Sequence, residues 1–398
     1  MAISVESRSG RAALMVMHCA GMVDLVALSM WVGTLIAAYG FDAQQAGTLP
    51  TLFLTGVVVS SLVLAPRIQR LPGRLVASAG FGLAAIAFFL ASGTAEFSRL
   101  AAFHAVAGLA AGAALSVTHG TIARSANPHR LFALVGIALG VFAIVFLGGV
   151  PQLIAALGGA VLFTTFAGVM ALGALAALLA FPSVLSPSSI SYASPSSSFS
   201  SSSAQSAPAV GPLPRIVWFG MAGIACMTLV QAMIFSFLEG VGAARGFERS
   251  AINAVLIALG LVNLLPAALA ALLERRIDAR SVLLAGPIVQ VALASVIMLS
   301  PAFAPYAVAA SLFAAVMIFT HTFAFGLLAR LDGSGRALAA TPAMLMIGSA
   351  LGPFLGGTLV EAFGYGALAA FAVVLGALAV FCFLRLPATG TPVVPALA

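Results

Sequence analysis

The chain has 398 residues, of which 62% are hydrophobic and only 7% are charged, and its mean hydropathy is +1.17. A water-soluble fold has too little interior for that much apolar surface, so the composition excludes a soluble globular protein and indicates a polytopic membrane protein. The net charge of +7 comes from 17 arginines with no lysine. Their positions, given below, explain this charge without a nucleic-acid partner.

The first part of the chain contains six apolar segments, each at least close to the ~20 residues that a helix needs to cross a bilayer. The first segment is too long to be the core of a cleaved signal peptide, so we expect it to remain as the first span. The six segments cover residues 12–39, 46–65, 75–92, 100–123, 131–150 and 160–181.

Residues 182–214 differ from both flanks, because they contain no charged residue and repeat Ser and Pro. Such a composition cannot bury a core and predicts a flexible linker. Six further apolar segments follow, at residues 216–238, 251–273, 281–299, 306–329, 337–360 and 367–384. The sequence therefore predicts an all-α membrane protein with twelve transmembrane helices in two six-helix halves, residues 1–181 and 215–386, and a disordered tail at 387–398.

The arginines test this arrangement independently of hydropathy. If the N-terminus is cytoplasmic, only Arg99, Arg245 and Arg249 fall on the outer side of the membrane. The positive-inside rule predicts such a bias for an even number of spans with both termini in the cytoplasm. The other 14 arginines are then cytoplasmic: Arg8, Arg11, Arg67, Arg70, Arg74, Arg124, Arg130, Arg215, Arg275, Arg276, Arg280, Arg330, Arg336 and Arg385.

The two halves match as an internal repeat when residue numbers are shifted by 206. The shift aligns the loop after the second span with the loop after the eighth, and the loop after the fourth span with that after the tenth. The aligned pairs are Arg70 with Arg276, Arg74 with Arg280, Arg124 with Arg330 and Arg130 with Arg336. Arginines are common in cytoplasmic loops of any membrane protein, but the shared spacings favour duplication of a six-helix unit.

Twelve spans, a repeat of six, a long central loop and basic loops after spans 2 and 8 together resemble the major facilitator superfamily of secondary transporters. The stretch Arg67-Ile-Gln-Arg-Leu-Pro-Gly-Arg74 is similar to the family's loop signature, although the leading Gly and the acidic residue are missing. The second half retains Asp278 in the corresponding loop. The resemblance implies a gating role for these loops, at Arg70, Gly73, Arg74, Arg276, Asp278 and Arg280.

The eleventh span contains glycines four residues apart, Gly348, Gly352 and Gly356, with Pro353 between them. Glycines at this spacing expose backbone for close helix packing, and the proline removes one backbone hydrogen bond. The pattern resembles the antiporter signature of the same family, which however belongs on the fifth span. Two interpretations stay open: a segment that bends or slides during transport, and tight packing alone.

Asp24 is the only acidic residue near the middle of a predicted span. A carboxylate there costs about 2.5–3.5 kcal/mol on insertion scales unless it faces a cavity or takes up a proton. Asp24 is therefore the first candidate for a site that binds protons or substrate. Trp31 lies seven residues further along almost the same helical face, where an aromatic ring can stack on a substrate or anchor the helix at the membrane interface.

The resemblance also implies that spans 1, 4, 7 and 10 line a central cavity. These spans contain one glutamine and, away from their outer ends, three histidines, and imidazole changes its charge near neutral pH. They are candidates for proton or substrate binding, or else hydrogen-bonded packing residues: His18, His119, Gln231 and His321. We expect Glu239, at an outer helix end, to be solvated.

No loop carries paired carboxylates, zinc ligands or a glycine-rich phosphate motif, so we expect no metal or cofactor, and a polytopic membrane enzyme is the less favoured class. We predict a monomeric secondary active transporter of the bacterial inner membrane that moves a small organic solute by alternating access. We do not expect the protein to be an enzyme. Proton-coupled export is favoured, since the cavity candidates carry only one charge. Proton-coupled uptake of a small acid or sugar is the alternative.

Reporter fusions test the topology directly. Fusions after Arg74, within residues 182–214 and at Ala398 should all report the cytoplasm, and a fusion near Gln44 should report the outside, because the arginine bias fixes the orientation. An outside signal from the linker fusion would contradict the twelve-span arrangement.

Overall fold

The computed structural model describes residues 3–64, 70–182, 214–273, 276–331 and 336–387. Most of the predicted linker and of the predicted tail lies outside these residues. Within them the regular elements are all α-helices. The helices of the first half are α1 (Arg8–Gly21), α2 (Val23–Tyr39), α3 (Ala43–Leu64), α4 (Gly73–Ser92), α5 (Phe97–Ala123), α6 (Pro128–Leu157) and α7 (Ala160–Ala180).

The second half begins at Arg215 and repeats this pattern of long apolar helices. In the described part of the chain, eleven helical segments are long and apolar enough to cross a membrane, with α1 and α2 counted as one. The remaining predicted span, residues 251–273, is divided into two shorter helices. The helices of the second half are α8 (Arg215–Ser236), α9 (Leu238–Ala244), α10 (Arg249–Val262), α11 (Pro266–Leu273), α12 (Ala279–Leu299), α13 (Phe303–Leu331), α14 (Arg336–Phe363) and α15 (Gly366–Leu384).

Three predicted spans are interrupted. The break before α11 has a local cause, because Pro266 lacks the N–H that a continuous helix needs and its ring opposes the preceding turn. The breaks at Met22 (φ −112°, ψ 22°) and Phe237 (φ −106°, ψ 9°) have no such cause in the sequence. Both residues are apolar and neither is Gly or Pro, so the hydropathy pattern continues across them without a signal.

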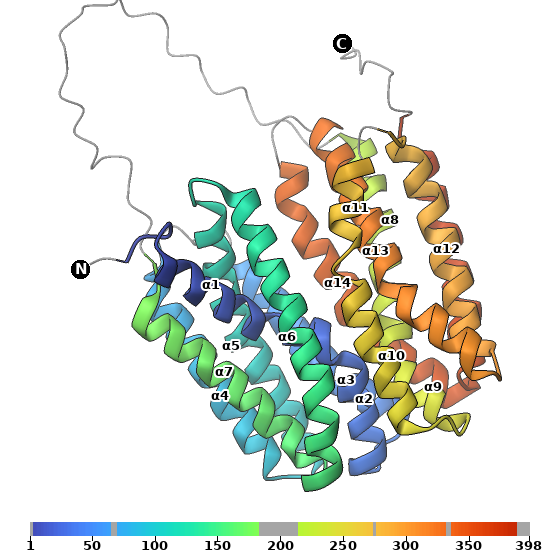
Figure 1. Ribbon diagram of the computed structural model, residues 1–398, viewed down its shortest axis with the longest axis horizontal. Coiled ribbons are helices and arrows are strands. Elements are labelled where there is room, and N and C mark those ends of the chain that lie inside the picture. The colour runs from blue at the N-terminus through green and yellow to red at the C-terminus, as the bar shows by residue number, and fades with distance from the viewer. Residues whose placement is uncertain (1–2, 65–69, 183–213, 274–275, 332–335, 388–398) are drawn as a thin grey trace, which may run out of the picture.

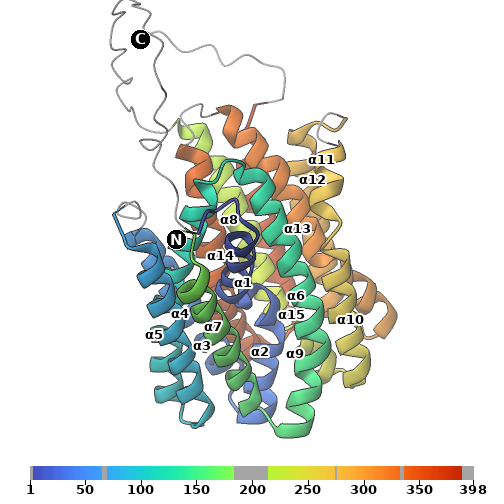
Figure 2. The ribbon, with the colours of Figure 1, turned by 60° about the vertical axis from the view of Figure 1, so that its left-hand side comes forward.

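The two halves form separate bundles that lie side by side, with the first half at the left and the second at the right of Figure 1. The described residues nearest both chain ends, and those flanking the linker, lie at the same end of the bundle (Figure 2). We call this end the termini face and the opposite end the far face. The loop between α2 and α3 and the loop between α14 and α15 lie at the far face.

The same arginine contact occurs in both halves at the termini face. The Arg74 guanidinium donates to the Leu178 carbonyl at the end of α7, and the Arg280 guanidinium donates to the Leu384 carbonyl at the end of α15 (3.1 Å). The two arginines are 206 residues apart, and so are the two leucines that accept from them, which is the shift found in the sequence. Each arginine satisfies a terminal carbonyl and places its charge at the negative end of a helix dipole.

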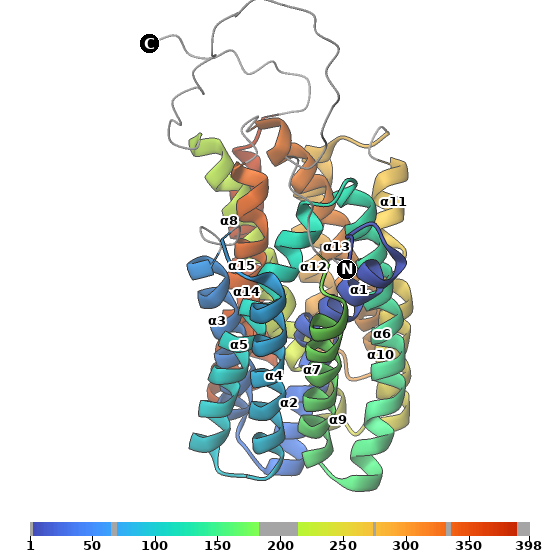
Figure 3. The same cartoon turned by 90° about the vertical axis from the view of Figure 1, so that its left-hand side faces the viewer.

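The halves meet most closely where α3 packs on α14 (Figure 3). A Cβ atom added to Gly47 would collide with the Pro353 carbonyl, and one added to Gly357 would collide with the Ala43 carbonyl. Two backbones from different halves can approach this closely only because glycine has no side chain.

Hydrogen bonds reinforce the contact between α3 and α14. The Phe354 N–H donates to Thr51 Oγ1 (3.1 Å), and Gln44 Nε2 donates to Thr358 Oγ1 (3.3 Å). The hydrogen bonds that join described residues of the two halves all lie toward the far face. The structure is therefore closed at the far face.

Three other glycines of α14, Gly348, Gly352 and Gly356, face α8 of the same half. A Cβ atom added to Gly352 would lie 2.6 Å from the Ala232 Cβ atom and 2.7 Å from the Met233 backbone nitrogen. Gly348 and Gly356 also approach α8, at Thr228 and Phe237 respectively. Helix α14 therefore packs tightly against two helices: α8 of its own half and α3 of the first half.

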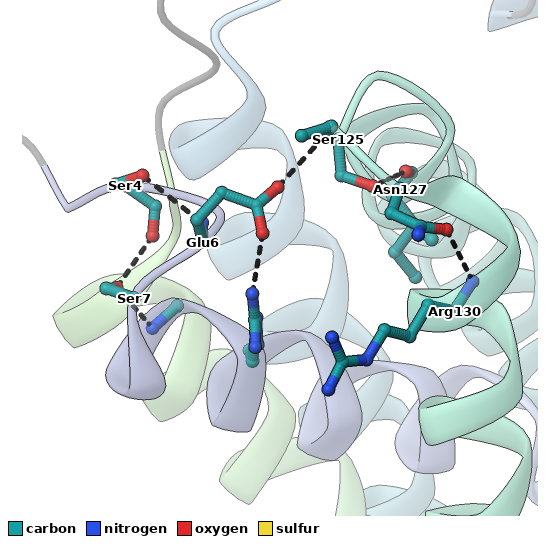
Figure 4. A network of polar contacts seen from close by, with 10 residues as sticks. Ser4, Glu6, Ser7, Ser125, Asn127 and Arg130 are labelled. Carbon is teal, nitrogen blue, oxygen red and sulfur yellow. Dashed lines mark hydrogen bonds and ion pairs between the residues drawn. The ribbon is translucent and has the colours of Figure 1, made fainter.

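A polar network joins the N-terminal segment to the loop between α5 and α6 (Figure 4). Arg11 donates to the Glu6 carboxylate (2.7 Å), which lowers the pKa of Glu6, and the Ala126 N–H donates to its other oxygen (3.0 Å). Ser7 caps α1 by accepting from the Gly10 N–H (3.0 Å). These contacts hold the start of α1 against the first-half bundle.

Substitution of Gly47 tests the close contact between the halves. Gly47→Ala should lower the melting temperature in detergent, because the new methyl group meets the Pro353 carbonyl of the other half. Gly82→Ala is the matched control, since an added Cβ meets nothing within 4 Å at that position of α4. This control should leave stability unchanged or raise it by up to ~1 kcal/mol, through helix propensity. Equal effects of both substitutions would contradict the close packing.

Candidate functional site

Asp24 lies in the first turn of α2, directly after the break at Met22, and only 5% of its surface is exposed. The start of a helix presents N–H groups without helical partners and a positive dipole end, and both favour a carboxylate there. The break in the first span therefore creates the polar surroundings of its only mid-span acid.

Helix α2 connects this acid to the boundary between the halves. It contacts α8 and α9 of the second half as well as α3, α6 and α7 of its own. A movement of the halves relative to each other therefore changes the surroundings of α2. The buried Asp24 carboxylate therefore lies on a helix that contacts both halves.

Two of the residues predicted to line the cavity, His18 and His119, are in contact in the structure. Nδ1 of His18 lies 2.9 Å from Nε2 of His119, and the ring centroids are 5.1 Å apart. One nitrogen must donate and the other accept, so the contact holds one proton between the two rings. His18 precedes Asp24 by six residues, and the break at Met22 lies between them, so the two residues belong to different helices.

The predicted residues of the second half do not join this group. Gln231 of α8 accepts a hydrogen bond from Gln290 of α12 (3.3 Å), and Gln290 also donates to the Met227 carbonyl (3.1 Å). Gln290 is fully buried and was not among the predicted residues, although it is a polar residue in the middle of a span. His321 of α13 lies against Phe325, with ring centroids 5.0 Å apart.

Trp31 is fully buried inside the first half, so its interpretation as an anchor at the membrane interface is wrong. Its Nε1–H donates to Nε2 of His104 (3.2 Å). Because that nitrogen accepts, the proton of His104 is on Nδ1, which donates to the Leu100 carbonyl (2.6 Å). Three phenylalanines contact the indole edge to face, and in this conformation the ring is enclosed by protein: Phe53, Phe88 and Phe166.

Glu239 is not solvated at an outer end, as its place in the sequence suggested. Its Oε2 atom is buried and has no hydrogen-bond partner among the described residues. The shift of 206 pairs Glu239 with Gly33, and a Cβ atom added to Gly33 would lie 2.9 Å from the Glu239 carboxyl carbon. The equivalence of these two positions is visible in the sequence, but it does not by itself predict that they are in contact.

The loop residues singled out in the sequence lie at the termini face. Asp278 caps α12, where it accepts from the Ser281 N–H (3.0 Å), whereas its counterpart in the first half is Pro72. Arg276, Asp278 and Arg330 line a pocket of about 320 Å³ with Thr322 of α13. In the corresponding loop of the first half, Arg70 is exposed. Gly73 in that loop lies close to the Phe181 ring.

A family model shows the family of this chain, and solved structures share its fold. The model of the Major Facilitator Superfamily matches residues 13–334. No curated protein sequence matches the chain significantly. Among solved structures, the nucleoside transporter NupG has a TM-score of 0.69 as a point mutant and 0.68 without the mutation, with 12% and 13% identity; each covers 94% of this chain and 98% of NupG.

A bacterial homologue of the human lysosomal transporter Spinster is also similar, in its inward-facing and occupied conformation. Its TM-score is 0.65 at 15% identity, over 94% of this chain and 93% of that chain. At these identities the similarity shows the fold alone.

The Trp31 cluster gives a stability prediction. Trp31→Phe keeps an aromatic ring but leaves Nε2 of His104 buried without a donor, which should cost ~1–3 kcal/mol and lower the melting temperature in detergent. Trp218→Phe is the matched control, because Trp218 is 56% exposed on α8. If the two substitutions change the melting temperature equally, the buried hydrogen bond does not contribute as described.

Proposed function

Because the chain belongs to the Major Facilitator Superfamily, we propose that it moves a small organic solute across the bacterial inner membrane by alternating access, coupled to protons through Asp24. The observation that carries this proposal is the buried Asp24 at the broken first span, on a helix that contacts both halves. An ionised carboxylate in a closed apolar bundle is costly, so proton uptake and movement of the halves are expected to be linked.

The orientation follows from the arginines. The termini face carries most of them, which supports a cytoplasmic termini face and an outward far face. In the described conformation the halves are closed at the far face. An access path to the site would then open toward the cytoplasm, and the opposite arrangement would require α3 and α14 to separate.

Export is the favoured direction, because the residues predicted to line the cavity include one acid and otherwise mostly neutral and apolar groups. Such a lining suits weakly polar organic compounds more than strongly charged metabolites. A panel of solutes tested in proteoliposomes with an imposed pH gradient identifies the substrate. The sign of accumulation separates export from uptake of a small acid or sugar, and turnover of a solute without any gradient would instead indicate an enzyme.

Asp24 substitutions test the coupling role. Asp24→Asn keeps the shape of the side chain but fixes its neutral form, so gradient-driven accumulation should disappear while membrane insertion is retained. Asp24→Glu should retain part of the activity with an altered pH profile. Asp42→Asn is the control, since Asp42 is an exposed cap that accepts from the Gln45 N–H (2.7 Å) and Asn caps helices equally well. Unchanged proton-driven transport in Asp24→Asn, at matched protein levels, rules out the coupling role.

A further inference from the structure

A second acid site lies between the two halves, toward the far face. A pocket of about 200 Å³ is enclosed by α2 and α6 of the first half and by α9 and α10 of the second. Its polar lining consists of Thr34, Glu239, Arg249 and Asn253, and the rest of the lining is mostly small and apolar. The pocket therefore exists only while the halves are together at this face.

The Glu239 side chain reaches from the second half onto the surface of the first. Its backbone N–H donates to Ser29 Oγ (3.1 Å), and its carboxyl group lies against Gly33, where no side chain blocks it. The Oε2 atom is buried without a hydrogen-bond partner. An ionised carboxylate left in this state pays for desolvation without the hydrogen bonds or ion pair that normally compensate it.

The charged and titratable groups around Glu239 compensate this cost only in part, because no described group forms an ion pair or a hydrogen bond with its Oε2 atom. Arg245 donates to the carbonyls of Ile297 and Met298, and the Tyr306 hydroxyl donates to the Leu238 carbonyl (2.9 Å). Arg249 lines the pocket, but its side chain is exposed. Two tyrosine hydroxyls also lie near the site, Tyr39 beside Gly159 and Tyr365 beside Gly240. Glu248, which precedes Arg249, is exposed and accepts from the Ser250 hydroxyl (2.6 Å).

The pocket marks a difference between two interfaces that the internal repeat relates. The shift of 206 places α3 on α10 and α6 on α14. The contact between α6 and α10 is therefore equivalent to the contact between α14 and α3. The α3–α14 contact is closed by backbone contacts at Gly47 and Gly357. At the α6–α10 interface, added Cβ atoms would meet side chains and no backbone: Ile144 and Leu147 at 3.9 Å from Gly260, and the Leu264 side chain, just after α10, close to Gly140. The α6–α10 interface is the one that leaves space beside Glu239.

We propose that Glu239 is a proton-binding site of this interface: it takes up a proton from the far side as the halves close there, and returns it when they open. The inference rests on the proposed function, because it adds a second proton-binding acid to a proton-coupled transporter. A proton fits the site better than a metal cation, since a proton needs only one oxygen atom whereas a metal ion needs several, and only a few oxygen atoms line the pocket. Proton binding then stabilises the closed far face.

Distance measurements between spin labels test this link without any transported solute. The labels are placed at Ala95→Cys and Ala302→Cys, exposed far-face positions of the two halves, after replacement of Cys19, Cys226 and Cys382 by Ala. In nanodiscs, the ratio of open to closed far-face populations should rise with pH, by up to about tenfold per pH unit, the limit for one proton. Glu239→Gln should stay closed at every pH, and Glu239→Asp should keep a pH dependence.

Two controls distinguish this site from the others. Glu96→Gln should retain the pH dependence of the parent protein, since Glu96 is exposed and pairs with Arg99 (2.7 Å) within the first half. Asp24→Asn should remove only the part of the pH dependence that Asp24 contributes and should retain the part that depends on Glu239, even though gradient-driven transport is lost. The inference is overturned if Glu239→Gln keeps the parent's pH dependence, if Asp24→Asn alone removes it, or if the far face responds to Na⁺ at constant pH and not to pH.

Discussion

The approach of α3 to α14 at Gly47 and Pro353 determines how the two halves lie in this structure. Backbone meets backbone across the boundary there, and hydrogen bonds from Phe354 to Thr51 and from Gln44 to Thr358 fix the register of the two helices. Small residues permit such contact, and few side-chain atoms must be rearranged to break it. The contact is consequently both specific and separable, which a transporter requires of the surface that opens and closes.

The internal repeat explains why one surface can close while the other stays looser. The duplicated halves retain equivalent contacts at the termini face, where Arg74 and Arg280 bind equivalent carbonyls. At the boundary between the halves they have diverged. Glycines fill the α3–α14 contact with backbone, whereas the α6–α10 contact retains a pocket and the carboxylate of Glu239. Of the two contacts that the repeat relates, only α6–α10 therefore has a buried acidic side chain beside a pocket.

Much of the fold was predictable from the sequence, because a bilayer demands long apolar helices and the arginines mark one side of it. Eleven of the twelve predicted spans are found as long apolar helices in the described part of the chain, and the two halves and the common face of both termini follow from the same constraints. The breaks at Met22 and Phe237 were not predictable, since both residues are apolar and the deviation arises from packing. The position of Pro266 did signal the third break, although the hydropathy pattern concealed it.

The candidate site was predictable only in part. Asp24 is conspicuous in the sequence because a mid-span acid is costly, and the structure places it in a buried helix start. Trp31 gave a misleading signal, because the sequence does not show that His104 and three phenylalanines surround it. Glu239 was passed over because depth along a helix does not reveal which face meets the other half. Contacts between distant segments decide both cases, and hydropathy does not report them.

The central claim is that the halves must separate at the far face during transport. A cross-link between Gln44→Cys and Thr358→Cys tests it most directly, since these side chains are hydrogen-bonded across the boundary at 3.3 Å. In a protein whose native cysteines are replaced, oxidation should stop transport of the solute found in the panel, and reduction should restore it. Full transport by quantitatively cross-linked protein would contradict alternating access through this surface.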